Sequence, residues 1–250
     1  MNFILTLSVV SQLAGCRSSE STKISALGFS ESAKAAFALY DDGQFKKAIP
    51  LLEREIKEAE AQGVSKEALS KYQLKVADCY YSIQEYEKAL DAVEQAIKNS
   101  GLTGKLELSD YLKLKSRVLY KMKRFKEAEK TAQRLLKIQE SRLGADSFEL
   151  IETLNLIIAA SCAEDRCADT EPLILRQLAL REKHLGNEHE HVAASLGMLA
   201  ELKEKKGELK EAEKLYRKAL QIRRKSSPHL VESSEKNILR IELKRLKMQQ

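Results

Sequence analysis

The sequence predicts an all-α fold built from repeated helical hairpins, and three observations lead to this prediction. The stretch from Leu143 to Arg223 contains one pattern twice: Leu143-Gly144 recurs as Leu185-Gly186, and the same 42-residue offset (186 − 144) aligns Leu178 with Leu220. Five turn-like segments recur along the chain at near-equal steps. Only 3 Pro and 10 Gly occur in 250 residues, and a chain rich in Leu, Ala, Lys and Glu favours helix. Self-similarity at a period of about 20–50 residues is typical of a solenoid of stacked units.

The composition supports one ordered domain, because 43% of the residues are hydrophobic and 32% are charged. The net charge is +6 and the isoelectric point is about 9.0. A basic balance can indicate nucleic acid, anionic lipid or an acidic protein surface as a partner. However, 37 acidic residues are mixed with the 43 basic ones along the chain. We therefore interpret the charges as solvated helix faces and expect no nucleic-acid partner.

The first residues are typical of a targeting signal rather than of the folded domain. An apolar run, Phe3 to Val10, is too short to span a bilayer but suits the core of a secretory signal. Leu13-Ala14-Gly15-Cys16 follows it and resembles a bacterial lipobox. The resemblance implies that residues 1–15 are a signal peptide cleaved before Cys16, which is then acylated on its thiol and its new amino terminus. Several acyl chains anchor a protein stably to a membrane.

Residues 16–29 then form the lipidated Cys16 and a polar, flexible tether. An Asp directly after the lipidated Cys retains Gram-negative lipoproteins in the inner membrane. Here that residue is Arg17, which implies the bacterial cell envelope and an outer-membrane anchor facing the periplasm. The residues before the apolar run, Met1-Asn2, carry no positive charge, so an accidental match remains the alternative.

Five helical hairpins are expected between residues 30 and 225, over approximately 30–63, 66–100, 107–143, 146–185 and 188–225. Each should carry a small residue near the start of its second helix, where two helices approach closely. The small residues are Ala48, Ala89, Ala128, Thr170 and Ala212, at steps of 41, 39, 42 and 42 residues. In the first three hairpins an aromatic residue precedes the small residue by three positions. Residues 228–250 should form a helix that caps the apolar end of the stack.

The second copy of the pattern identifies a family resemblance. It contains Gly207-x-Leu209-x-x-Ala212-Glu213-x-Leu215-Tyr216-x-x-Ala219-Leu220. This resembles a tetratricopeptide repeat (TPR) of the 42-residue kind found in kinesin light chains. The resemblance implies a right-handed superhelix of about five repeats plus the capping helix. It also implies a concave surface that binds a protein or peptide rather than a small-molecule substrate.

The concave surface of such a solenoid is lined by the first helix of each repeat. Tyr40, Tyr81 and Tyr120 occupy equivalent places eight residues before the small residue. Cations on the same helices are Lys34, Lys75, Lys113, Arg117 and Lys121. Aromatic rings beside cations suit an extended, partly acidic segment. The alternative is that the tyrosines pack between neighbouring repeats, as is common in this family.

No catalytic, metal or cofactor site is expected. His189 and His191 could suggest a metal pair, but His189 falls where the 42-residue repeat itself has His, at a helix start. The sequence has no His-Glu-x-x-His pattern and no phosphate loop after a strand, so we expect no enzyme. Cys162 and Cys167 flank the fourth turn. They either close a disulfide in an oxidising periplasm or remain two thiols, with Cys167 replacing the aromatic residue.

Two functional hypotheses follow from the sequence. The first is a membrane-anchored TPR scaffold that binds another protein in the bacterial cell envelope. The second is a soluble cytoplasmic TPR regulator or RNA-associated solenoid whose lipobox match is accidental.

Overall fold

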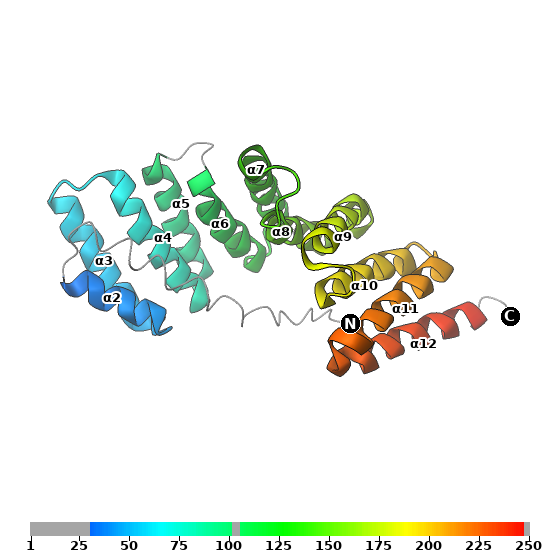
Figure 1. Cartoon of the computed structure of the whole chain (residues 1–250). Helices are drawn as coiled ribbons and strands as arrows, with labels where there is room; N and C mark the ends of the chain where they lie inside the picture. Colours follow the sequence, from blue (N-terminus) through cyan, green and yellow to red (C-terminus); the bar gives the residue numbers. More distant parts are fainter. Residues whose placement is uncertain (1–30, 102–105, 248–250) are drawn as a thin grey trace. The chain divides into compact units, whose positions relative to one another are not determined.

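The computed structural model describes residues 31–101 and 106–247, and over these residues it contains helices and turns only. The helices follow one another as antiparallel hairpins (Figure 1), which confirms the predicted all-α repeat fold. The predicted signal peptide, Cys16 and the tether lie outside the described residues. No helix within the described ranges is long and apolar enough to cross a membrane.

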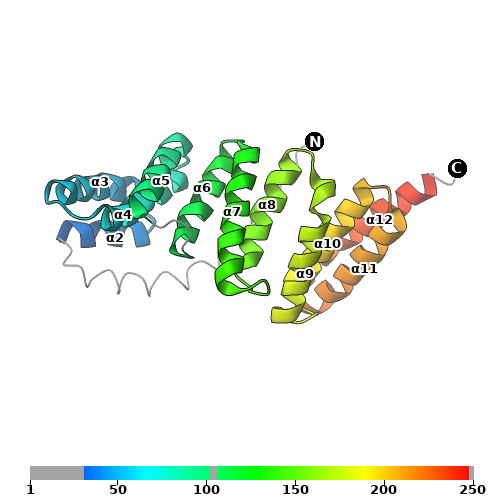
Figure 2. The ribbon, with the colours of Figure 1, turned by 90° about the horizontal axis from the view of Figure 1, so that it is seen from above.

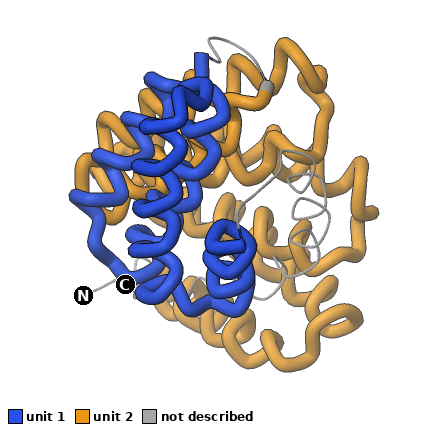
Figure 3. Tube along the Cα trace, turned by 90° about the vertical axis from the view of Figure 1, so that its left-hand side faces the viewer, with its two compact units in different colours: residues 1–102 blue, residues 103–250 orange. Residues whose placement is uncertain are grey.

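The chain forms two compact units, residues 1–102 and 103–250 (Figure 3). Helix α5 ends at Ser100, and Gly101 follows it in the left-handed conformation, with φ at 63°. Such a residue ends a helix because its backbone turns away from the helical path.

The first unit contains two hairpins. Their helices are α2 (Glu31–Asp41), α3 (Phe45–Ala61), α4 (Lys66–Ser82) and α5 (Tyr86–Ser100). Ala36, Leu52, Val76 and Cys79 belong to one buried apolar cluster that joins both hairpins. The predicted ranges 30–63 and 66–100 each contain one of these hairpins.

The second unit contains three hairpins and a last helix. It consists of η2 (Leu106–Leu108), α6 (Ser109–Lys121), α7 (Phe125–Leu143), α8 (Leu150–Ala163), η3 (Cys167–Thr170), α9 (Glu171–Leu185), α10 (Glu190–Lys205), α11 (Leu209–Ser226), η4 (Pro228–Leu230) and α12 (Val231–Lys247). Figure 2 shows α6, α7 and α8 side by side, as expected for stacked hairpins. Ile238 and Ile241 of α12 pack against Tyr216 and Leu220 of α11. The last helix thus covers the end of the fifth hairpin.

All five hairpins turn through the same backbone motif. One residue in each turn has a positive φ: Gly43, Gln84, Lys123, Asp165 and Gly207. The amide after it bonds a carbonyl five residues earlier, as in Gln44 N to Leu39 O at 2.8 Å and Glu208 N to Lys203 O at 2.9 Å. This is the Schellman arrangement, which satisfies carbonyls at a helix end.

The small residues predicted from the repeat spacing are all buried. Ala48, Ala89, Ala128 and Ala212 are 0% exposed, and Thr170 is 1% exposed. A larger side chain at these positions would separate two helices that are in contact. The spacing in the sequence therefore reflects the repeated turn and the close approach that follows it.

Candidate functional site

The three predicted tyrosines each contact the aromatic residue that begins the next helix. The ring centroids of Tyr40 and Phe45 are 5.7 Å apart, those of Tyr81 and Tyr86 5.9 Å, and those of Tyr120 and Phe125 5.3 Å. Aromatic pairs at this separation are favourable beyond their burial. The tyrosines therefore help to hold the turn of their own hairpin.

Tyr40 is the most buried of the three tyrosines and lies against the neighbouring hairpin. It is 7% exposed, and its hydroxyl donates to a carboxylate oxygen of Asp78 in α4. Lys75 Nζ lies 4.3 Å from the centre of the Tyr40 ring. Tyr40 and Lys75 thus pack α2 against α4, because the neighbouring hairpin covers the ring. The burial of Tyr40 favours the packing interpretation for this residue, and its role as a partner contact stays a prediction.

Tyr81 and Tyr120 differ from Tyr40 because both remain partly exposed. Tyr81 belongs to the first unit and Tyr120 to the second. Each ring therefore has an exposed part that another protein could contact. The rest of the ring contacts the aromatic residue after the turn.

The predicted cations lie on first helices, but several are engaged by neighbouring acids. Lys34 Nζ is 2.7 Å from Glu31 Oε1, and both side chains are well exposed. Lys113 Nζ of α6 is 3.1 Å from Glu152 Oε2 of α8. Arg117 is partly buried and Lys121 is exposed. The first-helix face in the second unit is therefore of mixed charge, with Arg117 and Lys121 one turn apart on α6.

A buried polar network that the sequence reasoning missed joins α8, α9 and α10. Gln177 Nε2 donates to Asn155 Oδ1 at 2.7 Å, and Arg181 Nη1 donates to Ser195 Oγ at 2.7 Å and to the carbonyl of His191 at 3.1 Å. Gln177 is 0% and Arg181 8% exposed. Burial lowers the pKa of Arg181 to about 10, so it stays charged at neutral pH. The network satisfies these buried groups and fixes neighbouring hairpins.

One feature of the sequence points to this network: the 42-residue offset places Arg181 and Arg223 at equivalent positions. In the structure Arg223 Nε lies 3.1 Å from Glu190 Oε1, and Arg223 Nη1 donates to Ser234 Oγ at 2.9 Å. Both arginines therefore link a second helix to the following first helix, which repeat alignment alone could not reveal.

Cys162 and Cys167 are joined in a disulfide. Their places in the fourth hairpin are those of the tyrosine and the aromatic residue in the first three, because the two members of each pair are separated by five positions. Lys205 Nζ of α10 lies 3.8 Å from Cys167 Sγ. The disulfide thus stands where the first three hairpins have a ring pair.

The histidines occupy a helix start. His189 is the N-cap residue of α10, and its Nδ1 accepts from the amide of His191 at 3.1 Å. An N-cap acceptor satisfies one of the free amides at a helix start. Over residues 31–101 and 106–247, no group of three or more His, Cys, Asp or Glu side chains is placed to hold a metal ion.

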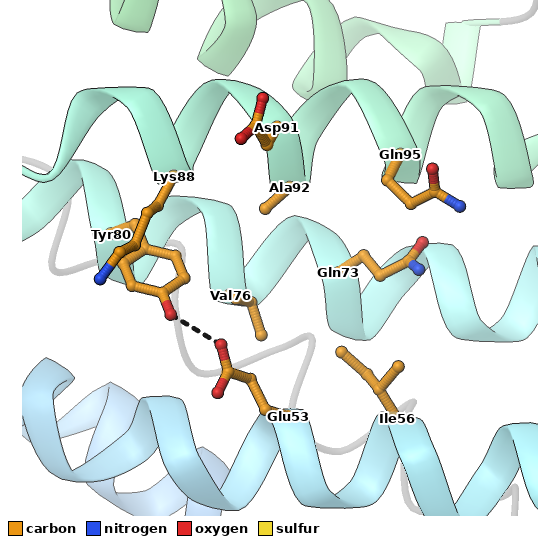
Figure 4. Close-up of a pocket in the computed structure, with 9 residues that line it drawn as sticks. All are labelled: Glu53, Ile56, Gln73, Val76, Tyr80, Lys88, Asp91, Ala92 and Gln95. Carbon is orange, nitrogen blue, oxygen red and sulfur yellow. Dashed lines mark hydrogen bonds between the residues drawn. The ribbon is translucent and has the colours of Figure 1, made fainter.

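A shallow pocket of about 290 Å³ lies between α3, α4 and α5 in the first unit (Figure 4). Ile56, Val76 and Ala92 contribute its apolar side chains. Tyr80 donates from its hydroxyl to Glu53 Oε1 at 2.6 Å, and Lys88 Nζ lies 5.4 Å from the Tyr80 ring centre. Burial, assisted by Glu53, raises the pKa of Tyr80 to about 12. The pocket could accept one apolar side chain, but it is at the small end for a ligand site.

Comparison with known families matches residues 149–225 to the tetratricopeptide repeat. These residues span α8 to α11 and include most of the two copies aligned by the 42-residue offset. No curated protein matches the chain significantly.

Among solved structures, the nearly identical TPR-like repeats of a putative kinesin light chain from Podosopora anserina share 20% identity, with a TM-score of 0.66 over 77% of this chain and 93% of that one. BtubC (BKLC) from P. vanneervenii shares 17% identity, with a TM-score of 0.62 over 79% of this chain and 82% of that one. YrrB, a TPR protein with an unusual peptide-binding site, shares 15% identity, with a TM-score of 0.58 over 88% of this chain and 99% of that one. At these identities the likeness shows the fold.

Proposed function

We propose that this chain, whose residues 149–225 belong to the tetratricopeptide repeat family, is a non-enzymatic scaffold that binds another protein along the first helices of its hairpins. The repeated hairpin fold carries this proposal, because stacked hairpins present an extended row of first helices to a partner. The peptide-binding site of YrrB, which has the same fold, supports a peptide-like partner.

The partner segment is extended and partly acidic. Tyr120, Arg117 and Lys121 of α6 support this chemistry in the second unit, since a partly exposed ring stands on the same helix as two cations. Charged groups on a surface attract the opposite charge over about 8–10 Å at physiological salt. Binding should therefore weaken as the salt concentration rises.

Selection from a displayed library of random peptides tests this proposal with the full chain. The selected peptides should be enriched in Asp and Glu, and the double substitution Arg117→Glu with Lys121→Glu should weaken their binding at least several-fold. Lys137→Glu is the matched control, because Lys137 is an exposed cation on the second helix α7 and should leave binding unchanged. Equal binding by the double variant would place the site elsewhere.

The scaffold is anchored in the bacterial cell envelope through Cys16. The sequence Leu13-Ala14-Gly15-Cys16 supports this part of the proposal, and the two acylated positions would give stable attachment. Cys16→Ala should move the protein from the membrane fraction to the soluble fraction and abolish labelling by a palmitate analogue. Unlabelled wild-type protein in the cytoplasmic fraction would favour the soluble regulator instead.

A further inference from the structure

The outer face of α12 carries a row of exposed leucines. Leu239 is 56%, Leu243 51% and Leu246 58% exposed, whereas Ile241 on the opposite face is 0% exposed. An apolar pocket of about 400 Å³ lies along this row, lined by Lys236, Leu239, Arg240, Leu243 and Lys244. Leucines grouped at spacings of four and three on one helical face form a stripe that favours packing against another helix.

The repeat register shows what kind of neighbour this stripe fits. Leu246 follows Glu204 by one period (246 − 204 = 42), and Leu239 follows Lys113 by three periods (239 − 113 = 126). Glu204 Oε2 of α10 lies 2.8 Å from Arg240 Nη2 of α12, the next first helix. Lys113 of α6 likewise contacts Glu152 of the next first helix, α8. Asn155 of α8, two periods before Leu239 (239 − 155 = 84), instead contacts Gln177 of its own second helix, α9. The leucines therefore stand at positions that meet both the following first helix and the second helix of the same hairpin.

A neighbour in the place of the following first helix would run parallel to α12. Consecutive first helices are separated by one antiparallel second helix, so they share a direction. Heptad positions agree with this: Leu239 and Leu246 are d positions and Leu243 is an a position, so that Glu235 and Glu242 are g positions and Arg240 is an e position. In a parallel pair of α12 helices, Glu235 of one copy lies beside Arg240 of the other. An antiparallel pair would bring like charges together.

The opposite charges on the two sides of the stripe also decide between classes of partner. Glu235 and Glu242 retain 50% and 40% side-chain exposure and Arg240 retains 46%, although each also has a partner within its own unit. Lys236, Arg240 and Lys244 line the pocket, so an anionic membrane or an acidic helix would be attracted on that side of the stripe and repelled by Glu235 and Glu242 on the other. A second copy of the same helix offers a cation to each acidic side and an acid to each basic side.

We propose that α12 is a self-association surface, on which a second copy of this chain docks its own α12 in parallel. The leucines of the two copies form the contact, and the Glu235–Arg240 pairs set its direction. This inference goes beyond the proposed function, since it concerns α12, a helix that carries none of Tyr120, Arg117 and Lys121. Three leucines per copy make a contact smaller than a standard stable interface of about 800 Å² per partner. The dimer should accordingly be weak and concentration-dependent.

Sedimentation equilibrium of the full chain between micromolar and millimolar concentrations tests the proposal. The wild type should move from monomer to dimer, and Leu243→Glu should remain monomeric with unchanged helicity. Leu175→Glu is the matched control, because Leu175 is an exposed leucine of the same unit, on α9 and 46% exposed. It should dimerise as the wild type does. A monomeric wild type at all concentrations, or equal dimerisation of both variants, overturns the proposal.

A short bismaleimide cross-linker tests the direction of the helices. Leu239→Cys alone should yield a cross-linked dimer in excess of the wild type. In an antiparallel pair centred on Leu243, that variant would cross-link only when mixed with Leu246→Cys, and this outcome overturns the parallel arrangement. Binding of vesicles rich in anionic lipid that Leu243→Glu abolishes, without any dimer, would assign the face to a membrane and overturn self-association.

Discussion

The residue with a positive φ in each turn is a glycine in the first and fifth hairpins but a larger residue in the other three. Lys123 has φ at 61° and Gly207 has φ at 79°. A residue with a Cβ atom is strained in the left-handed region by about 1–2 kcal/mol, and glycine is not. Three hairpins therefore keep a strained residue in a turn that the repeat fold requires.

Lys123→Gly should raise the free energy of unfolding by about 1 kcal/mol, because relief of strain exceeds the added flexibility of the unfolded chain. Gly207→Ala should lower it by a similar amount. A Cβ atom at Gly207 would have nothing within 4 Å, so its effect comes from the backbone alone. Urea unfolding followed by circular dichroism measures both changes. A destabilised Lys123→Gly would mean that the lysine side chain itself stabilises the turn.

The exposure of the three tyrosines could not be predicted from the repeat spacing. The spacing placed Tyr40, Tyr81 and Tyr120 in equivalent positions, and their equivalent contacts with the turn are found. Their exposure differs, because Asp78 and Lys75 from the next hairpin cover Tyr40 alone. Burial by a neighbouring element depends on tertiary contacts that repeat spacing does not encode.

At the level of elements, the α8–α9 hairpin stands apart because a disulfide replaces the ring pair. Cys162 and Cys167 are five residues apart, and closing so short a loop should contribute about 2 kcal/mol through the unfolded chain. The oxidised protein should therefore unfold at a higher urea concentration than the reduced one.

Replacing the two cysteines by an aromatic pair tests whether a ring pair stabilises this hairpin as well as the disulfide does. The double substitution Cys162→Tyr with Cys167→Phe should retain most of the oxidised stability and lose the response to reductant. Urea unfolding with and without dithiothreitol measures both effects. A double variant no more stable than the reduced wild type would show that the two pairs are not equivalent.

The close approach of helices in each hairpin gives a second prediction for elements. Ala212→Leu should destabilise the fifth hairpin by about 1–3 kcal/mol, because the larger side chain must be accommodated where two helices touch. Ala179→Leu is the control, since Ala179 is exposed on α9. Thermal melting of both variants measures the difference. Equal melting temperatures would contradict the repeat register.

The helical hairpins could be predicted from the sequence, whereas the ion-pair partners of their charged side chains could not. Helical periodicity and the small residues repeat along the chain, so the hairpins could be placed from sequence. The sequence predicts that Lys75 and Lys113 line a groove. In the structure Lys75 lies over the Tyr40 ring, and Lys113 forms an ion pair with Glu152. Which lysine stays available depends on acids of the next hairpin, which lie about 40 residues further along.

For the whole molecule, the division into two units was not predicted. The repeat spacing continues across the boundary, from Ala89 to Ala128, at 39 residues. Periodicity therefore gives no sign of separate units. The two glycines in Gly101-Leu102-Thr103-Gly104 were the only local signal, and glycines also occur in turns that do not divide the chain.

In the second unit, several glutamates form ion pairs with lysines and arginines of neighbouring hairpins. Hydrogen bonds from Lys203 and Lys206 hold the pKa of Glu171 below its ordinary value. Burial would raise the pKa of Glu204, but hydrogen bonds from Lys244 and Arg240 outweigh it and the pKa is lowered. These ion pairs link α9 to α10 and α10 to α12. Acid should therefore weaken the stacking of hairpins in this unit.

The sign of the pH effect follows from the lowered pKa values. Folding is favoured by these carboxylates above the unfolded value of 4.5, and this stability is lost as the pH falls through the lower folded values. Urea midpoints at about pH 7 and about pH 4 should therefore differ, with the lower midpoint in acid. Glu204→Gln cannot ionise, so it should reduce stability at neutral pH and flatten the pH dependence. Glu211→Gln, at an exposed position of α11, should leave the profile nearly unchanged. A Glu204→Gln profile as steep as that of the wild type would show that other carboxylates govern acid unfolding.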